Sequence, residues 1–556
     1  MSIIEITRLV LTRLAPASPG PTADDELVGE PVLRRADVLP LVVYVAFAMV
    51  LGWQMGQDGN WDLRNYHLYN AFMWFSGRFE RDVHVAGVQT FLNPVLHLPF
   101  YFAVTKFNVA PMVYGLALSG IHGVLLFFAH RITALVLASH GWMVAAIGGT
   151  IAATTAAYGA AFYSEIGSTQ GDNTVALLIL GALTLLVANA QAGRAGILRT
   201  SRRAGLAAGL AAGAKLVASI YVLGLLVAVL TMPGPWRTRV QRALHFGLTA
   251  SLGLVLTGGY WMWLMYEHFG SPLFPFFNRI FASPLAPIEN FSDTFRPASW
   301  EATIVLPFRF VAEQLLSGET YFRDGRLPAA LVSLAAICLV GGKRWLSARG
   351  STASAENVRL RQLASFFAVS YVIWLAVFAL YRYAISLEAL SAAIIVSCAA
   401  YLARNRVEGL LIALPICVLL IFSTKPLGYE RIPWTNSFFG VSRDHLTQYH
   451  DAVVLLTDFP TAYSIPFFPQ STTFLRISSN WGLDPGSEMW RRVQQRVANA
   501  PADRLYWLEI APYATQKEAD ELLAPFDVAL RQSACDETTT NFDSLRICPI
   551  DRRRPN

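Results

Sequence analysis

The sequence predicts an all-α polytopic membrane protein that carries a small α/β domain at its C-terminus. Of its 556 residues, 54% are hydrophobic and only 15% are charged, and the mean hydropathy is +0.41. A soluble domain averages about a quarter charged residues. Apolar runs of membrane-spanning length recur between Val38 and Phe422, and each span needs about 20 such residues. Beyond about residue 425 the apolar runs become short and alternate with polar stretches, as in a domain outside the membrane.

Roughly eleven transmembrane passes are expected, because Lys and Arg are enriched in cytoplasmic loops and mark which apolar runs are consecutive passes. Arg34 and Arg35 precede the first run, which assigns residues 1–36 to the cytoplasm and the large loop 57–94 to the outer side. The expected passes are Val38–Met55, Val109–Phe128, Trp142–Tyr163, Thr174–Ala190, two within Ala204–Met232, Leu244–Tyr266, Leu327–Val340, Ala364–Leu380, Leu387–Leu402 and Leu410–Phe422.

Two apolar segments need separate interpretation. Ala204–Met232 is too long for one pass and has arginines on both sides, so we expect a hairpin of short helices with Lys215 near its tip. Leu92–Phe107 is either an interfacial helix or an extra short pass. The membrane domain is therefore taken as residues 37–424, with the N-terminus inside and the C-terminus outside, in a bacterial inner membrane.

The last part of the chain, residues 425–556, predicts a small periplasmic α/β domain. Ala452–Leu456 and Leu505–Ile510 have the composition of short buried strands, and Ser487–Ala498 and Gln516–Leu523 that of helices. Cys535 and Cys548 lie here, and they form a disulfide if the domain is exported and remain free thiols otherwise. No His/Cys cluster has zinc-ligand spacing. The basic charge lies in short loops between apolar runs, where it orients the chain, so no nucleic acid partner is expected.

The first outer loop contains the most informative carboxylate, Asp62. If Asn60 or Asp58 caps a helix here, Asp62 and Tyr66 lie on one face of that helix at a four-residue step. The alternative is that Asp62 only stabilises the first turn through the helix dipole.

A family resemblance favours a catalytic role for Asp62. The loop resembles the first outer loop of the C-type glycosyltransferases, which include bacterial aminoarabinose transferases and protein O-mannosyltransferases. The resemblance implies a sugar donor linked to polyprenyl phosphate, an inverting transfer, and Asp62 as the catalytic carboxylate. Leu63 replaces a second acid of the family motif, so the acceptor or the metal requirement is expected to differ. The matching stretches are Asp62-x-x-x-Tyr66, Gly77-Arg78, Gln89-Thr90-Phe91-Leu92-Asn93-Pro94 and Gly270-Ser271-Pro272-Leu273-Phe274-Pro275-Phe276-Phe277-Asn278.

Such a transfer needs a base for the acceptor hydroxyl and positive charge for the departing phosphate. Lys215 is the strongest cation candidate, because a charge inside an apolar segment is costly and usually functional. Arg382, between two tyrosines at an outer helix end, is similar to an Arg-Tyr pair of the same superfamily. Arg323 is a weaker candidate, and Asp324 is expected to pair with either Arg323 or Arg326. The alternatives are that Lys215 snorkels to an interface and that Arg382 is an interfacial anchor.

Three further side chains complete the predicted substrate site. Tyr66 shares the helix face of Asp62, and His67 is a candidate to orient the Asp62 carboxylate. Asp172 belongs to a polar loop on the same side and either orients the acceptor or only caps the next helix. Asp62 and Asp172 are compatible either with a bound divalent cation or with a site that works without a metal, and no other cofactor is expected.

The sequence therefore favours a membrane glycosyltransferase that acts at the outer face of the inner membrane. Its acceptor is expected to be an envelope glycan, a glycolipid or a protein hydroxyl. One alternative is a transporter or flippase of a lipid-linked intermediate, which needs polar residues along a path through the bilayer. Another is a non-catalytic assembly protein that binds through its outer domain.

Overall fold

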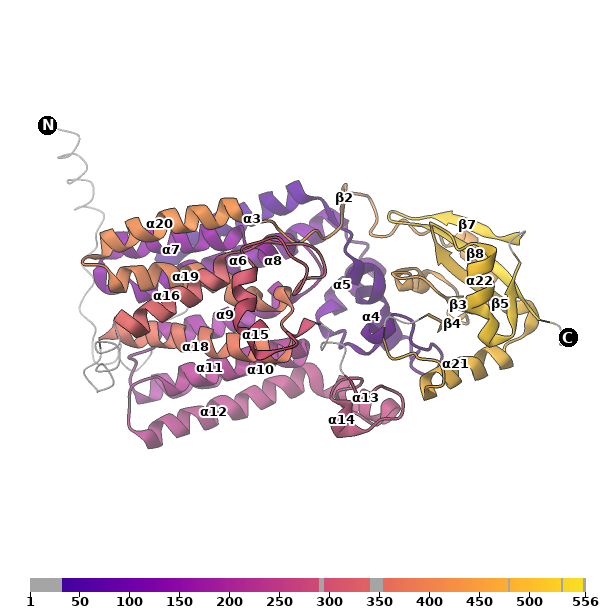
Figure 1. The fold of residues 1–556 in the computed structure, drawn as a ribbon, viewed down its shortest axis with the longest axis horizontal. Helices are drawn as coiled ribbons and strands as arrows, with labels where there is room; N and C mark the ends of the chain where they lie inside the picture. The colour runs from indigo at the N-terminus through magenta and orange to yellow at the C-terminus, as the bar shows by residue number, and fades with distance from the viewer. Residues whose placement is uncertain (1–32, 290–294, 341–353, 479–480, 532–533, 554–556) are drawn as a thin grey trace.

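The structure is a computed structural model that describes residues 33–289, 295–340, 354–478, 481–531 and 534–553. Most of the expected cytoplasmic segment 1–36 lies outside these residues. The molecule is elongated, with a bundle of long helices at one end and an α/β domain at the other (Figure 1). We refer to the end of the bundle nearest the α/β domain as the domain end.

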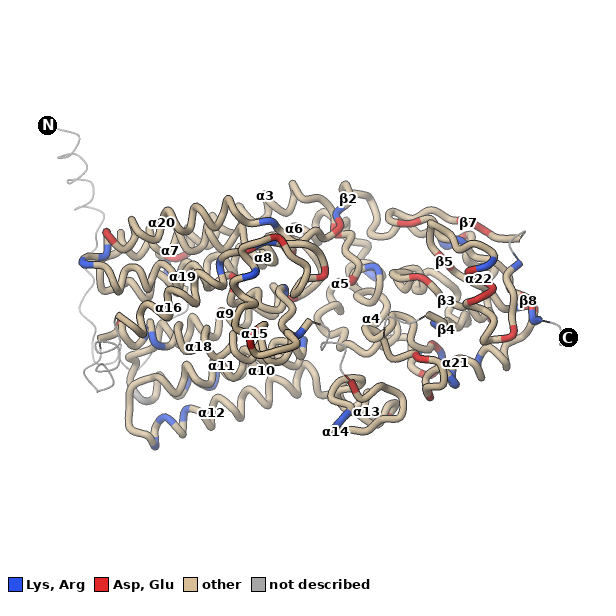
Figure 2. The backbone as a smooth tube through the Cα atoms, viewed as in Figure 1, with Lys and Arg blue, Asp and Glu red and all other residues tan. Residues whose placement is uncertain are grey.

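Each of the eleven expected passes corresponds to helical structure in the bundle. Six helices among the described residues are long and apolar enough to cross a membrane, which makes the chain a multi-pass membrane protein. The bundle helices are α3 (Val38–Met55), α6 (Pro111–Val136), α7 (Trp142–Ala157) followed by α8 (Ala160–Ser164), α9 (Asp172–Ala188), α10 (Arg194–Ala214), α11 (Ser219–Leu230), α12 (Trp236–Leu254) continued by η7 (Val255–Gly259) and α13 (Tyr260–Phe269), α16 (Arg326–Val340), α18 (Ala355–Val377), α19 (Ile385–Leu402) and α20 (Arg406–Ser423). Figure 2 shows long stretches of these helices without Lys, Arg, Asp or Glu.

The predicted hairpin with Lys215 at its tip is confirmed. Helix α10 ends at Ala214, and Lys215 adopts an extended conformation with φ −145° and ψ 111°. The short helix η6 (Leu216–Ala218) then leads into α11. The extended residue breaks the helical hydrogen bonding at the point where the chain reverses, so the lysine is placed at a helix end.

Leu92–Phe107 is not an extra pass. It contains η4 (Val95–His97) and α5 (Leu98–Thr105), which together span about 16 Å at 1.5 Å per residue, far less than the roughly 30 Å of a bilayer core. Figure 1 places α5 beside α4 (Leu68–Phe75), between the bundle and the α/β domain. Two shorter helices, α14 (Asn278–Phe281) and α15 (Trp300–Arg309), belong to the segment between α13 and α16.

The α/β domain confirms the two predicted strands and the two predicted helices. Its sheet has the strand order β4-β3-β5-β8-β6, with β7 also paired to β8. Strands β4, β3 and β5 are mutually parallel, whereas β8 is antiparallel to β5. Cys535 and Cys548 form a disulfide. The elements are β3 (Val453–Leu456), β4 (Thr473–Arg476), α21 (Glu488–Asn499), β5 (Leu505–Ile510), α22 (Gln516–Leu523), β6 (Val528–Leu530), β7 (Asp536–Thr539) and β8 (Ser544–Arg552).

The first outer loop packs against the α/β domain rather than standing alone. Strand β1 (Gln57–Asp58) pairs with β2 (Arg431–Ile432), in the segment that leads into the domain. Further along the loop, Val83 forms a parallel bridge with Leu475 of β4. Buried side chains of the loop and of the domain belong to one hydrophobic cluster, separate from the bundle core. The loop is therefore held between the bundle and the domain.

Candidate active site

A cavity of about 890 Å³ lies where the domain end of the bundle meets the first outer loop. One part of its wall is polar and charged, and another part is apolar and rich in aromatic side chains. The charged and polar residues that line it are Asp62, Arg64, Gln89, Asn93, His97, Gln170, Lys215, Arg296, Glu319, Thr320, Arg382 and Glu430.

Asp62 is placed in the cavity wall by a capped helix start, as predicted. The side chain of Asn60 accepts a hydrogen bond from the backbone N–H of Leu63 at 2.9 Å, and Asp58 in turn accepts from the Asn60 amide. The turn after Asp62 is π-helical, η2 (Leu63–His67), and continues directly into α4. Asp62 is 7% exposed, so its carboxylate is set within the wall of the cavity and not in bulk solvent.

Arg382 contacts Asp62 directly. Its Nη1 donates to Asp62 Oδ2 at 2.7 Å, and both side chains are buried. Arg382 lies in η9 (Tyr381–Ala384), at the junction between α18 and α19. The same guanidinium reaches Glu319 Oε1 at 3.3 Å and Asp172 Oδ2 at 4.0 Å. One cation thus joins three carboxylates that come from three different segments of the chain.

Lys215 provides the second cation of the site. Its Nζ donates to Asp172 Oδ1 at 2.6 Å and to the backbone carbonyl of Gln170 at 3.0 Å. Asp172 is the first residue of α9, where the helix dipole also favours a negative charge. The side chain of Lys215 is 18% exposed and that of Asp172 only 2%, so the lysine faces the cavity and the aspartate lies behind it.

The apolar wall is built around the ends of two helices and an aromatic loop. It combines the glycine- and alanine-rich end of α10, the side chains of α13, and the loop after α13. Asn93 ties the first outer loop to this wall, because its amide donates to the carbonyls of Gly213 and Thr257 at 2.8 and 2.9 Å. The aromatic members are Phe91, Trp261, Phe274, Phe276, Phe277, Phe295, Phe378 and Tyr383.

His67 does not orient Asp62, contrary to the prediction. Its Nδ1 is 2.8 Å from Thr169 Oγ1, and Thr169 donates its own hydroxyl hydrogen to Asp58. Burial, and next the charges of Lys215 and Arg382, hold the pKa of His67 well below its usual range. A neutral ring in this position stacks on His97 with 3.9 Å between ring centroids. The π-helical turn rotates His67 into this buried layer behind the cavity.

Tyr66 lines the cavity, as the shared helix face predicts. Its side chain is 4% exposed, and its ring meets the rings of His67 and His97 edge to face. Burial, reinforced by the negative charge of Asp62, raises the pKa of Tyr66 well above its usual value. The phenol therefore remains protonated and offers a hydrogen-bond donor or acceptor to a ligand.

Arg323 lies outside the group of charged side chains that surrounds Asp62 and Arg382. Its Nε donates to the carbonyl of Ser423 at 2.6 Å, and it is not among the residues that line the cavity. Arg326, the other candidate partner of Asp324, forms that ion pair at 2.8 Å in a fully buried position. The two arginines thus brace the ends of α16 and α20.

Glu319 is a charged residue of the site that sequence reasoning missed, and Arg64, Arg296 and Glu430 of the cavity wall were missed as well. Its side chain is 35% exposed to the cavity and contacts Arg382 and the hydroxyl of Tyr429, which donates at 3.2 Å. Burial raises the pKa of Glu319, and the charge of Arg382 opposes this while that of Asp62 adds to it.

Two ion pairs form the centre of the charged group. Asp62 faces Arg382, Asp172 faces Lys215, and Glu165 lies behind Asp172 with a pKa that burial and then the charge of Asp172 raise well above its usual value. Within the described ranges, no three His, Cys, Asp or Glu side chains form a group that could hold a metal ion. Lys215 and Arg382 are the cations of this charged group, and Arg64 and Arg296 also line the cavity.

These features define a class: a multi-pass membrane protein with a charged site at the head of a partly apolar cavity, beside an α/β domain. No protein-family model matches the chain, and no curated protein matches its sequence. Among solved structures, the chain is similar to the oligosaccharyltransferase of Archaeoglobus fulgidus crystallised with Zn and sulfate, with 14% identity, a TM-score of 0.47, and coverage of 84% of this chain and 67% of that one.

It is also similar to ArnT from Cupriavidus metallidurans. The apo form matches with 15% identity and a TM-score of 0.43, covering 92% of this chain and 98% of that one. The form bound to undecaprenyl phosphate matches with 14% identity and a TM-score of 0.42, covering 93% and 99%. All three TM-scores are below 0.5.

Proposed function

We propose that this protein is a C-type membrane glycosyltransferase that moves a sugar from a polyprenyl-phosphate donor to a hydroxyl group of an envelope glycan, glycolipid or protein. The observation that carries the proposal is that one cavity combines Asp62, Arg382 and Lys215 with an extensive apolar wall. A lipid-linked sugar phosphate is an anion with a long hydrocarbon chain. It needs cations and apolar surface next to each other, as this cavity provides.

In this proposal Lys215 and Arg382 bind the donor phosphate. Both cations are already desolvated, so their attraction to an anion is stronger than it would be in water. Each holds a carboxylate in the free protein, and an arriving phosphate shares the same donors. Arginine suits this role because its fork can contact a carboxylate and a phosphate oxygen at once. The apolar wall formed by α10, α13 and the loop after α13 takes the first part of the polyprenyl chain.

Asp62 is proposed as the general base. When Arg382 also contacts the phosphate, one oxygen of the Asp62 carboxylate becomes available to accept a hydrogen bond from the acceptor hydroxyl. The carboxylate takes the hydroxyl proton while the acceptor oxygen forms a bond to the anomeric carbon. The bond from that carbon to the phosphate oxygen breaks, and polyprenyl phosphate leaves with both bonding electrons, stabilised by Arg382 and Lys215. Tyr66 and Asp172 are proposed to shape this site, and His67 to support it from behind.

The proposed function also implies an orientation of the chain in the membrane. We infer that the domain end and the α/β domain face the periplasm of a bacterial inner membrane, and that the N-terminus is cytoplasmic. Polyprenyl-linked donors then reach the cavity from the bilayer, and envelope acceptors reach it from the periplasm.

Replacement of Asp62 by Asn tests the proposal. Envelope glycans compared by mass spectrometry with and without the protein would first identify the missing sugar and its acceptor. With that pair in vitro, Asp62→Asn is expected to lower transfer about a hundredfold or more, which is the range for loss of a general base, with donor binding retained. A lipid transporter would show no sugar transfer in either form, and that outcome would refute the proposal.

A matched pair of arginine variants tests the phosphate contact in the same assay. Arg382→Gln is expected to weaken donor binding and to lower transfer, because it removes the shared cation. Arg323→Gln, outside the cavity wall, is the control and should leave both unchanged.

A further inference from the structure

The π-helical turn after Asp62 is held from outside the membrane bundle. In η2 (Leu63–His67) the backbone hydrogen bonds reach one residue further than in an α-helix, a geometry that is rare, short and frequent at functional sites. Such a turn persists when neighbouring contacts hold its side chains in place. On one side, the Asn65 amide donates to the carbonyl of Ala86 at 2.9 Å. The other side is held by Arg64.

Arg64 links this turn to the α/β domain. Its Nη1 is 3.1 Å from Asp543 Oδ1, its Nη2 is 2.6 Å from Glu430 Oε2, and its guanidinium carbon lies 5.5 Å from the centre of the Phe542 ring. The side chains of Arg64 and Asp543 are 10% and 12% exposed, whereas that of Glu430 is 48% exposed. The contact with Asp543 is thus the less solvated of the two, and it is the one that comes from the α/β domain.

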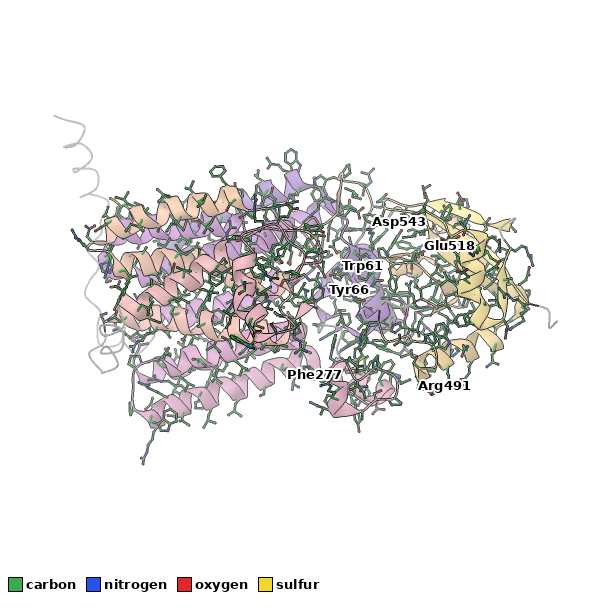
Figure 3. The ribbon with its side chains drawn as sticks, in the orientation of Figure 1. Trp61, Tyr66, Phe277, Arg491, Glu518 and Asp543 are labelled. Carbon is green, nitrogen blue, oxygen red and sulfur yellow. A yellow bond between two sulfur atoms is a disulfide. The ribbon has the colours of Figure 1, made fainter. Side chains whose placement is uncertain are left out.

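Asp543 is itself held rigidly within the domain. It lies between β7 and β8, where its backbone N–H donates to Thr540 Oγ1 at 2.9 Å. Its second carboxylate oxygen accepts from the hydroxyl of Tyr463, also at 2.9 Å. Figure 3 shows Asp543 at the side of the α/β domain that faces the first outer loop, with Trp61 and Tyr66 between the domain and the bundle.

The domain also stacks on the residue before Asp62. The ring of Phe459 lies 5.9 Å from that of Trp61, at an interplanar angle of 29°. Arg476 of β4 covers the Phe459 ring at 3.8 Å and donates to the carbonyl of Val85 in the same loop at 2.9 Å. Asp62 is therefore flanked in sequence by Trp61 and Arg64, each of which contacts the α/β domain.

We propose that Asp543 is a positioning residue for Asp62: through Arg64 it holds the π-helical turn that sets the Asp62 carboxylate against Arg382. The α/β domain is then part of the catalytic apparatus without touching substrate. Loss of the Asp543 charge allows the turn to relax toward α-helical hydrogen bonding, which shifts Asp62 relative to the bundle. This inference rests on the proposed function for its catalytic consequence, but the holding of the turn is a property of the protein alone.

The test compares the full chain with its Asp543→Asn, Asp543→Glu and Asp551→Asn variants in lipid nanodiscs. Asp551→Asn is the matched control, because it makes the same chemical change in β8, on an ion pair with Arg531 in which both side chains are about half exposed. Amide hydrogen exchange over residues 61–70 is followed by mass spectrometry, and sugar transfer is measured with the donor and acceptor identified above.

Asp543→Asn is expected to speed exchange over residues 61–70 about tenfold, the scale of one lost charge-assisted hydrogen bond. It should lower kcat about tenfold while the KM for the lipid donor is unchanged, because the phosphate-binding cations are untouched. Asp543→Glu should recover most of both effects, and Asp551→Asn should show neither.

Unchanged exchange in Asp543→Asn would overturn the inference, since the contact would not hold the turn. Faster exchange with an unchanged kcat would overturn it as well, because the turn would then not position Asp62. If the wild-type chain transfers no sugar, the proposed function fails, while the exchange measurement still decides whether Asp543 holds the turn.

Discussion

The helical bundle has one hydrophobic core. The first outer loop and the α/β domain, together called the outer layer, share a second core of different composition. The bundle core is rich in alanine, with most of its helices in close contact, whereas the core shared by the first outer loop and the α/β domain is rich in phenylalanine, tyrosine and tryptophan. In lipid there is little hydrophobic gain in bringing helices together, so small residues that allow close backbone approach drive packing. In water, large apolar side chains provide the driving force.

Helices α10 and α12 show the first kind of packing. Gly205, Gly209 and Gly213 recur every four residues along α10, and a side chain on any of them would meet the backbone of α12. The outer layer shows the second kind, with Trp507 of β5 fully buried at the centre of the sheet. Buried positions in the bundle should therefore be destabilised by adding atoms, whereas buried positions in the other core should be destabilised most by removing them. The active site lies at the boundary between them.

The largest effect is expected when a large side chain is truncated in the core of the outer layer. Trp507→Ala should destabilise the α/β domain by about 3–5 kcal/mol, the cost of removing a large buried aromatic side chain. Limited proteolysis of the full chain in increasing urea would measure it as earlier cleavage within residues 440–553. Ile510→Ala, at a half-buried position on the same strand, is the control with a smaller shift. Equal resistance of Trp507→Ala and wild type would contradict the distinction between the cores.

In the bundle core, adding one carbon should also lower the stability, but by a smaller amount. A methyl group on Gly209 would overlap the carbonyl of Ala250, so Gly209→Ala should destabilise the bundle by about 1–3 kcal/mol through overpacking. The thermal unfolding midpoint in detergent micelles measures this. Gly247 on α12 has no neighbouring atoms within 4 Å of an added methyl group, so Gly247→Ala is the control and should keep or slightly raise the midpoint through its higher helix propensity. A similar loss in both variants would mean that the close approach of α10 and α12 is not the cause, because helix propensity alone favours Ala over Gly.

The smallest effect is a pH dependence confined to the outer layer. Burial lowers the pKa of His84 to about 4, against about 6.5 for an unfolded chain. Between these values the unfolded state binds more protons, so stability decreases as the pH falls below 6.5, by about 1.4 kcal/mol at pH 5.5. His84→Asn should remove this part of the pH dependence in the same proteolysis assay, and Asn tolerates the positive φ of 56° at this position. An identical pH response in both proteins would show that His84 does not titrate as expected.

Much of the architecture was predictable because its causes are local. Membrane passes follow from the length of apolar runs and from the placement of arginine, and the predicted hairpin with Lys215 at its tip matches the structure. Strands and helices of the α/β domain were predicted from short stretches of sequence as well. The same local reasoning placed Asp62, Tyr66, Lys215 and Arg382 on one side of the membrane, where the structure brings them to one cavity.

Other features of the site depend on contacts between distant segments. Hydropathy and local spacing carry no information about Glu319 meeting Arg382, about His67 turning to Thr169, or about Arg323 lying apart from the cavity. The contact of Arg64 with Asp543 joins residues 479 positions apart, and a π-helical turn changes which side chains share a face. Local hydropathy was sufficient to predict which segments cross the membrane and where charge is rare, because those properties belong to each segment separately. The partner of each charge was decided only by the folded chain, since an ion pair depends on distances that no single segment contains.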